Sequence, residues 1–169
     1  MGTYARITGT VTAAAALTLA LAGAASAAPA TATATAEKKA AAPALATAAR
    51  STVVKLNNWT GCTLTRENWW LDHGIWTSEP PVRIYANQQG QWSSESNGFA
   101  TGTEGHARFF SENCADPVLN GRILQVHWNN PYVGSNTYDS SFTDLKFYVP
   151  QPAGGGGNNT TAEFSAWAR

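Results

Sequence analysis

Residues 52–68 read TVVKLNNWTGCTLTREN, and this stretch indicates the fold class. Its two arms, 52–58 and 62–68, are rich in β-branched residues and alternate them with polar ones, as half-buried strands do. Thr60 and Gly61 lie between the arms and favour a reversal of the chain. We therefore expect the two arms to pair as a β-hairpin.

Short segments of the same kind continue along the chain, separated by turn-forming residues. No window of ten or more residues combines helical periodicity with capping residues. The further strands are expected at 82–87, 91–96, 106–112, 122–128, 144–150 and 161–168. About eight short strands of this spacing predict an all-β fold, a single antiparallel β-sandwich.

Glycines punctuate two of the connections. In ESNGFATGTEG (95–105), Asn97-Gly98 favours one turn, and Gly102 and Gly105 flank a second turn or a bulge. The segment AGGGGNN (153–159) predicts a flexible loop before the last strand. A phosphate-binding loop would need Lys and then Ser or Thr after the glycines, followed by a helix, and this pattern is not present.

The N-terminal region has the pattern of a targeting segment. Arg6 precedes an apolar run that ends at Ala25-Ser26-Ala27, which predicts a signal peptide over 1–27 and a secreted, extracellular protein. Residues 28–50 are rich in Ala and Thr, which favours a low-complexity spacer or pro-segment over a short Ala-rich helix. The folded domain is expected over 51–169.

The charge of residues 51–169 limits the classes of partner. Seven basic and ten acidic residues give this region a net charge of −3. It lacks the basic surface that nucleic acid requires and the polybasic cluster used for anionic lipids. Any membrane affinity must therefore come from aromatic and polar contacts.

Two cysteines, Cys62 and Cys114, predict a disulfide in an exported protein, the alternative being two buried thiols. Closing this loop of about fifty residues would stabilise the fold by roughly 4 kcal/mol. His73, His106 and His127 show no metal-ligand spacing, and no metal or cofactor is expected. The carboxylates are scattered and no serine lies in a nucleophile elbow, so we expect no catalytic residues and no enzyme activity.

Five blocks of sequence, in order from about residue 53 to 167, resemble the aegerolysin family. They are TVVKLNNWTGCTLTREN, HGIWTSEPP (73–81), ESNGFATGTEG, NNPYVGSNTYD (129–139) and GGGGNNTTAEFSA (154–166). The likeness is greatest to the small component of two-part Bacillus insecticidal crystal toxins. It implies a β-sandwich like that of the actinoporins, recognition of membrane lipids of the sphingolipid type, and a larger partner protein that completes a pore. The longer turn at 111–122, the cysteine pair and Trp69-Trp70 depart from that pattern.

Aromatic and amide side chains in the turns are the candidate lipid contacts. Indole prefers the head-group zone of a bilayer, and Asn or Tyr can bind head groups. The candidate anchors are Trp69, Trp70, Trp76 and Trp92, and the candidate head-group contacts are Asn130, Tyr132, Asn136 and Tyr138. Purely structural roles remain open for all of them. The alternative function is a non-lytic carbohydrate- or protein-binding module.

Overall fold

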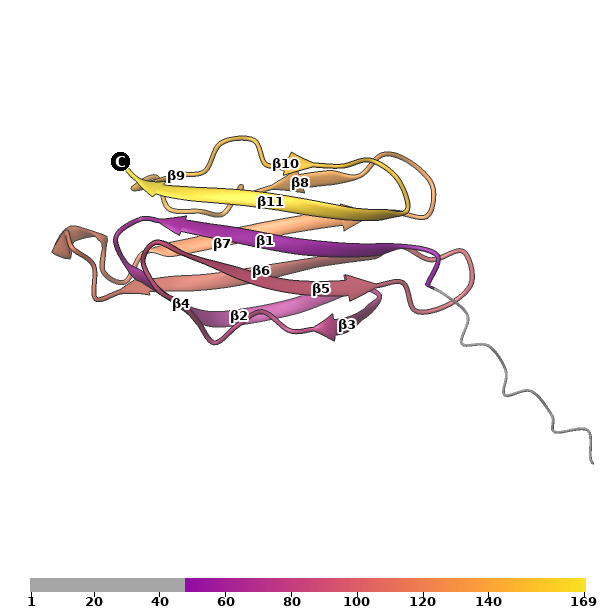
Figure 1. The fold of residues 1–169 in the computed structure, drawn as a ribbon, viewed down its shortest axis with the longest axis horizontal. Coiled ribbons are helices and arrows are strands. Elements are labelled where there is room, and N and C mark those ends of the chain that lie inside the picture. Colours follow the sequence, from indigo (N-terminus) through magenta and orange to yellow (C-terminus); the bar gives the residue numbers. More distant parts are fainter. Residues whose placement is uncertain (1–47) are drawn as a thin grey trace, which may run out of the picture. The chain divides into compact units, whose positions relative to one another are not determined.

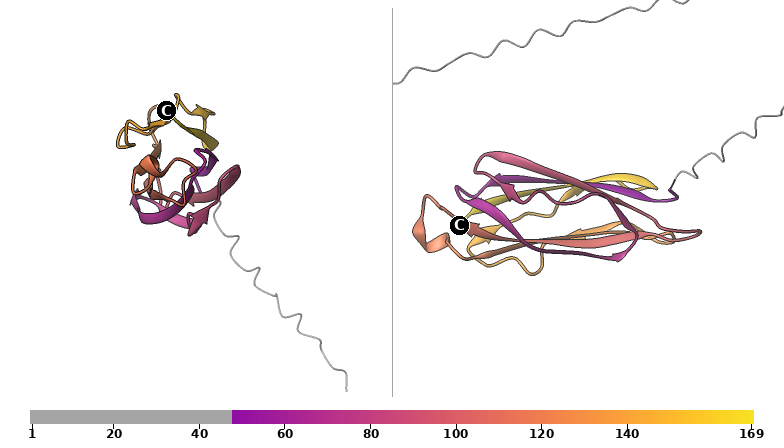
Figure 2. Two further views of the ribbon diagram at one scale, coloured as in Figure 1. Left: turned by 90° about the vertical axis from the view of Figure 1, so that its left-hand side faces the viewer. Right: turned by 90° about the horizontal axis from the view of Figure 1, so that it is seen from below.

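The computed structural model describes residues 48–169, so the predicted signal peptide and nearly all of the predicted spacer lie outside the described residues. Two β-sheets pack face to face (Figures 1 and 2). The predicted β-sandwich is confirmed. Within residues 48–169, no helix is both long and apolar enough to cross a membrane.

The strands divide between the sheets as follows. Sheet A contains β10 (Ala153–Gly154), β11 (Asn159–Ala168), β1 (Ser51–Trp59), β5 (Gln88–Glu95) and β3 (Ile75–Ser78) in that order, and β9 (Phe147–Tyr148) also pairs with β11. Sheet B contains β4 (Arg83–Ile84), β2 (Thr63–His73), β6 (Thr103–Glu112), β7 (Ile123–Asn130) and β8 (Thr137–Asp139). A 3₁₀ turn, Pro117–Leu119, lies between β6 and β7. Three short strands, β3, β8 and β10, were not expected from the sequence.

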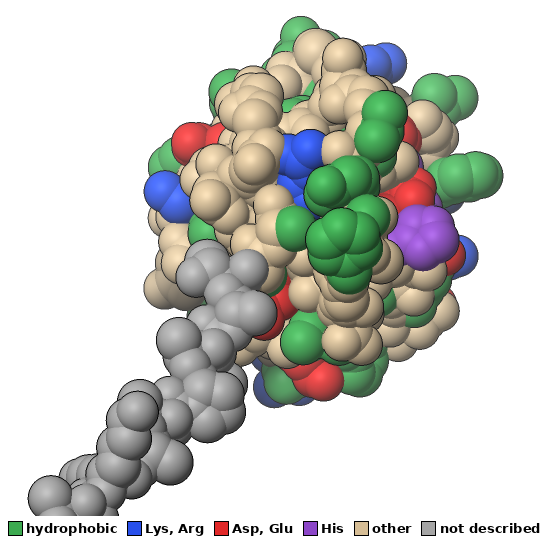
Figure 3. Space-filling view, turned by 90° about the vertical axis from the view of Figure 1, so that its right-hand side faces the viewer, with side chains coloured by type: hydrophobic (Ala, Val, Ile, Leu, Met, Phe, Trp, Pro, Cys, Tyr) green, Lys and Arg blue, Asp and Glu red, His purple; other side chains and the backbone are tan. Residues whose placement is uncertain are grey.

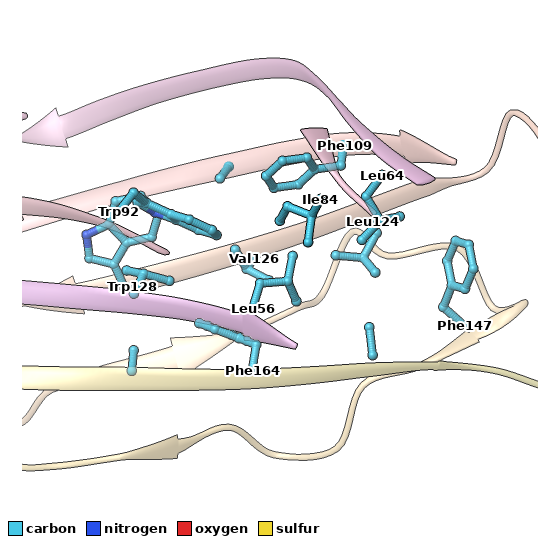
Figure 4. Close-up of a cluster of buried hydrophobic side chains, with 14 of the residues drawn as sticks. Leu56, Leu64, Ile84, Trp92, Phe109, Leu124, Val126, Trp128, Phe147 and Phe164 are labelled. Carbon is cyan, nitrogen blue, oxygen red and sulfur yellow. The ribbon is translucent and has the colours of Figure 1, made fainter. Parts of the chain in front are cut away.

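The core forms where the inward faces of the two sheets meet. In β1, β6 and β11 every second residue is buried, so each strand offers one apolar face to the opposite sheet. Leu56, Phe164 and Trp92 of sheet A pack toward Phe109 and Trp128 of sheet B (Figure 4). Full burial of each such side chain contributes about 1.5–3 kcal/mol.

One pairing differs from the expected antiparallel arrangement. β1 and β11 run in parallel, in a continuous register from Ser51 beside Asn159 to Trp59 beside Trp167. β1 pairs with β5 on its other side in the antiparallel sense. The first and last strands enter sheet A from the same end, and a sequence pattern of period two carries no information about strand direction.

The predicted hairpin over 52–68 is wrong, because β1 and β2 belong to different sheets. The chain crosses between sheets at Thr60 and Gly61, and Gly61 has a φ of 74°. Asn58, fully buried, holds this corner: its amide nitrogen donates to the carbonyls of Cys62 (2.8 Å) and Ile84 (2.9 Å). Its amide oxygen accepts hydrogen bonds from the backbone N–H (3.2 Å) and hydroxyl (2.7 Å) of Thr60.

The predicted disulfide is confirmed between Cys62 and Cys114. It joins the start of β2 to the segment that follows β6, and the Ala115 N–H donates to the Gly61 carbonyl at 2.9 Å beside it. The bridge therefore reinforces the corner that Asn58 organises.

The prediction of a second turn at 102–105 is wrong, because Gly105 lies within β6, but its alternative, a bulge, agrees with the register shift between Leu71 and His73 of β2 opposite this glycine. A Cβ at Gly105 would lie 2.5 Å from Leu71 Cδ2 and 2.7 Å from Trp128 Cζ2. Gly105 is thus required by the close approach of side chains from β2 and β7, the two neighbours of β6 in sheet B. Gly98, with a φ of 131°, does occupy the predicted turn.

We predict that Asn58→Ala lowers the free energy of unfolding by about 2–4 kcal/mol, because it leaves buried backbone groups without partners, at about 1–3 kcal/mol each. Urea denaturation followed by tryptophan fluorescence measures the change. Asn129→Ala, a half-buried position on the outer face of β7, is the control and should shift stability by less than about 0.5 kcal/mol. Equal destabilisation by both variants would contradict the role given to Asn58.

Candidate functional site

Four loops and the start of β1 meet at one end of the sandwich, which we call the loop end. It comprises Arg50, the β2–β3 turn at Gly74, and the loops 96–102, 131–136 and 155–158. Figure 3 looks onto this end, where hydrophobic side chains gather beside a basic group. Loops held by a rigid sandwich are a common place for binding residues.

The first part of the loop end is apolar. A pocket of about 510 Å³ lies here, and Ile75, Phe99 and Tyr132 are its large lining side chains. Phe99 is 96% exposed at the tip of loop 96–102, and Val133 is 83% exposed on loop 131–136. Large apolar side chains held in water at loop tips are typical of surfaces that bind a partner or a membrane.

The second part of the loop end is polar and centred on Arg50. The Arg50 guanidinium donates a hydrogen bond to the Tyr132 carbonyl and lies 5.5 Å from the centre of the Tyr132 ring. On its other side a pocket of about 410 Å³ is lined by Arg50, Asn136, Gln151 and glycines 154–157.

Arg50 carries a charge that its surroundings do not neutralise. Within residues 48–169, no carboxylate oxygen lies within 4.0 Å of its guanidinium, and its Nε is buried with no hydrogen-bond partner. A guanidinium without a carboxylate partner favours an anionic ligand, since the planar group can donate two parallel hydrogen bonds to a phosphate or a carboxylate. The loop end therefore combines apolar tips with one cation.

Three of the four predicted head-group residues hold the loops in place. Asn130 is fully buried, and its amide donates to the carbonyls of Ser51 (3.1 Å) and Asn158 (3.0 Å). Asn136 donates to the carbonyls of Gly155 and Gly157 at 3.2 and 3.1 Å. The Tyr138 hydroxyl donates to Gly155 at 2.9 Å from a buried ring.

Tyr132, the fourth of these residues, is 40% exposed and reaches the pocket beside Arg50. Asn136 and Tyr138 line the polar pocket, but their hydrogen bonds are directed to the glycine loop. Asn130 lies too deep to touch a ligand, which corrects the prediction that it contacts head groups.

The four predicted tryptophan anchors are not gathered at one surface. Trp92 is 1% exposed and packs in the core against Phe109 and Trp128, so its prediction as an interfacial anchor is wrong for this fold. Trp76 is half-buried, with its ring 5.7 Å from that of Trp128. The alternation along β5 placed Trp92 inward, together with Gly90 and Ser94.

Trp69 and Trp70 are half-buried on β2. The Arg66 guanidinium lies 3.6 Å from the centre of the Trp69 ring. Trp70 stacks on His106, with ring centroids 4.5 Å apart. The exposed tips Phe99 and Val133, and the cation Arg50, were missed. A bulky residue directly after the Asn97-Gly98 turn was the available signal for Phe99, since a turn tip cannot reach the core.

A row of rings and carboxylates crosses the outer face of sheet B. His106 stacks on His127 at 4.3 Å and contacts Asp72, with 3.0 Å between Nε2 and Oδ2. His127 lies between two carboxylates, with Nδ1 2.7 Å from Asp139 and Nε2 3.0 Å from Glu104. Within residues 48–169, no group of three or more His, Cys, Asp or Glu side chains is arranged to hold a metal ion.

Two pKa values in this row are shifted. Burial lowers the pKa of His106 below its usual 6.5, and the neighbouring His127 lowers it further, against the opposing effects of Asp72 and Glu104. For Asp139, burial raises the pKa, but hydrogen bonds from His127 and Ser141 outweigh burial and lower it below 3.8. The fold therefore favours the neutral imidazole of His106 and the carboxylate of Asp139 over their protonated forms.

Comparison with known proteins supports the fold. No known protein family and no curated protein matches the sequence. Among solved structures, the lipid-binding protein Nakanori is similar, with a TM-score of 0.56 and 14% sequence identity over 71% of each chain. Likeness at this identity shows a shared β-sandwich. The resemblance to the Bacillus toxin component stays a prediction.

We predict that acidification destabilises the domain partly through His106. Its pKa is lower in the folded state, so the unfolded chain binds more protons and the free energy of unfolding falls as pH drops below about 6.5. His106→Gln should flatten the pH dependence of unfolding between about pH 7 and pH 5. Thermal or urea unfolding across this range measures it.

His73→Gln is the matched control, because the His73 side chain is 70% exposed. It should leave the slope of stability against pH close to that of the unaltered protein. An unchanged slope in His106→Gln, or an equal flattening in His73→Gln, would contradict the assignment.

Proposed function

We propose that this protein is a secreted, non-enzymatic protein that binds membrane lipids through the loop end. Phe99 and Val133 enter the bilayer interface, and Arg50 binds a lipid phosphate beside them. The single observation that carries the proposal is the presence, at one end of the sandwich, of two exposed apolar loop tips and a cation that has no carboxylate partner within residues 48–169. The lipid-binding description of the structurally similar Nakanori supports it.

The charge of the domain determines how such binding works. With a net charge of −3 over residues 51–169, the domain gains nothing from general attraction to an anionic membrane. Affinity must come from burying apolar tips and from one directed contact to a phosphate. A zwitterionic phospholipid offers such a phosphate without a strongly negative surface.

The finer proposals rest on the aegerolysin resemblance. They are preference for sphingolipids, a cytolytic role, and a larger partner protein that completes a pore. The strands from β1 through β11 are all packed within the two sheets. A pore-forming barrel requires a long amphipathic hairpin that can insert into the bilayer. Strands already packed in this way are consistent with the need for a partner protein that supplies the barrel. Leakage from sphingomyelin vesicles only when a neighbouring gene product is added would support this reading.

We predict that Phe99→Ala weakens binding to sphingomyelin-containing vesicles about tenfold, because burial of one large apolar side chain is worth about 1.5–3 kcal/mol. Sedimentation with vesicles of phosphatidylcholine, sphingomyelin or ceramide phosphoethanolamine measures the affinity. Phe142→Ala, at a position 72% exposed and away from the loop end, is the control and should bind as the unaltered protein does. Negligible binding to every vesicle, or equal losses in both variants, would reject the proposal.

We predict that Arg50→Gln weakens binding to phospholipid vesicles about tenfold or more, since a charge-assisted hydrogen bond contributes about 1.5–3 kcal/mol. Arg50→Lys should restore part of the affinity, because it keeps the charge and loses the planar fork. Vesicles of uncharged lipids without phosphate provide the comparison. A variant that loses affinity for both kinds of vesicle alike would show that Arg50 only supports the loops.

A further inference from the structure

An aromatic row lies on the outer face of sheet A, at the end opposite the loop end. Trp59 of β1 and Trp167 of β11 are neighbours in the parallel register, and Tyr148 of β9 pairs with Trp167. Their exposed fractions are 44%, 38% and 48%. Neighbouring strands lie about 4.8 Å apart, so the row extends over about 10 Å. Nothing in the proposed lipid site uses these rings.

Polar side chains form a connected network beside the rings. The Asn57 amide nitrogen donates to the Glu163 carboxylate (2.8 Å) and to the Ser165 hydroxyl (3.1 Å). The Gln89 amide donates to Asn57 Oδ1 at 2.7 Å. The network crosses three adjacent strands, β11, β1 and β5, and fixes the orientation of each group.

A groove brings the two sets together. The segment 150–153 runs along β11 and encloses a pocket of about 370 Å³ whose lining includes Trp167, Glu163, Ser165 and Gln151. This volume falls at the low end of the range for small-ligand sites, about 300–1,000 Å³. The Trp167 indole forms part of the lining, and the other groups offer a carboxylate, a hydroxyl and an amide.

We infer that this groove binds a neutral glycan. A sugar ring has an apolar C–H face, which packs on an indole, and hydroxyl groups around its edge, which need both donors and acceptors. The Glu163 carboxylate accepts from sugar hydroxyls, and the Gln151 amide both donates and accepts. The row of Trp59, Trp167 and Tyr148 offers stacking positions for successive sugar units.

Charge selects among ligands. Among residues 48–169, the lining of the groove includes the Glu163 carboxylate and no Lys or Arg, and Lys55 lies beside Glu163 in the β1–β11 register without a nitrogen within 4.0 Å of its carboxylate. A groove whose lining holds a carboxylate and no Lys or Arg disfavours phosphate and acidic sugars, which need a cation. It also disfavours insertion of this face into a bilayer, because Glu163, Asn57 and Gln89 would lose water without new partners.

Geometry places the glycan away from any membrane bound at the loop end. β1 runs from Ser51 beside Arg50 to Trp59, nine residues in all (Figure 1). At about 3.3 Å per residue, Trp59 lies about 26 Å from Ser51 along this strand, and the groove extends from the aromatic row back to Glu163 in the middle of β11. The stacking positions of the aromatic row therefore lie far from a bilayer bound at the loop end, and the occupant we infer is a soluble or cell-wall glycan.

Titration of the full chain with neutral cello-, chito- and manno-oligosaccharides, followed by tryptophan fluorescence and by a glycan array, tests the inference. We expect binding to at least one neutral oligosaccharide. Trp167→Ala and Glu163→Gln should each weaken it at least tenfold, and Trp167→Tyr should retain a measurable part. Tyr85→Ala, at a position 54% exposed and outside the groove, should leave it unchanged.

Parallel vesicle sedimentation separates this site from the proposed lipid site. Trp167→Ala should keep its vesicle affinity, and Phe99→Ala should keep its glycan affinity. Near-ultraviolet circular dichroism confirms that each variant is folded. The inference is overturned if no neutral oligosaccharide binds at millimolar concentration, if binding survives in the Trp59→Ala, Trp167→Ala double variant, or if only glycolipid vesicles bind. It is also overturned if Trp167→Ala reduces binding to sphingomyelin vesicles, which would assign these rings to a lipid surface.

Discussion

β1 and β11, the first and last strands of the sandwich, pair in parallel over nine residues, and both candidate sites depend on this register. At one end it sets Arg50 beside the glycine loop, with the Ser51 N–H donating to the Asn158 carbonyl at 2.9 Å. At the other end it sets Trp59 beside Trp167. A shift of one residue would turn every β11 side chain to the opposite face and remove both arrangements.

Buried amides and one phenol fix the loops that the strands leave free. Asn58 holds the corner between sheets, Asn130 joins β7 to the end at which β1 and β11 begin, and Tyr138 holds the glycine loop. Each of these groups is buried and hydrogen-bonded, so its loss leaves carbonyl groups without partners. Loops held in this way present their tips at defined positions, which lowers the entropy cost of binding.

The two surfaces differ in charge and therefore in the ligands they suit. The loop end joins apolar tips to a guanidinium that has no carboxylate partner among residues 48–169, which suits the proposed lipid phosphate. The groove on sheet A joins an indole to a carboxylate in a lining that, in the same part of the chain, holds no Lys or Arg, which suits a neutral sugar. Arg50 and the aromatic row lie at opposite ends of β1, so the stacking positions proposed for a glycan are separate from the proposed membrane contacts.

The sequence by itself determined the β-sandwich, the disulfide and the turn at Gly98, because period-two alternation, cysteine count and Asn-Gly dipeptides act locally. It did not determine that β1 and β2 separate into different sheets, since a Thr-Gly turn suits both a hairpin and a corner. It gave both Tyr132 and Trp92 as candidate lipid contacts. Only the structure showed that the Tyr132 side chain is exposed and the Trp92 side chain is buried in the core. The cation at Arg50 and the row of Trp59, Trp167 and Tyr148 come from residues up to about a hundred positions apart, and only the tertiary structure decides which distant strands become neighbours.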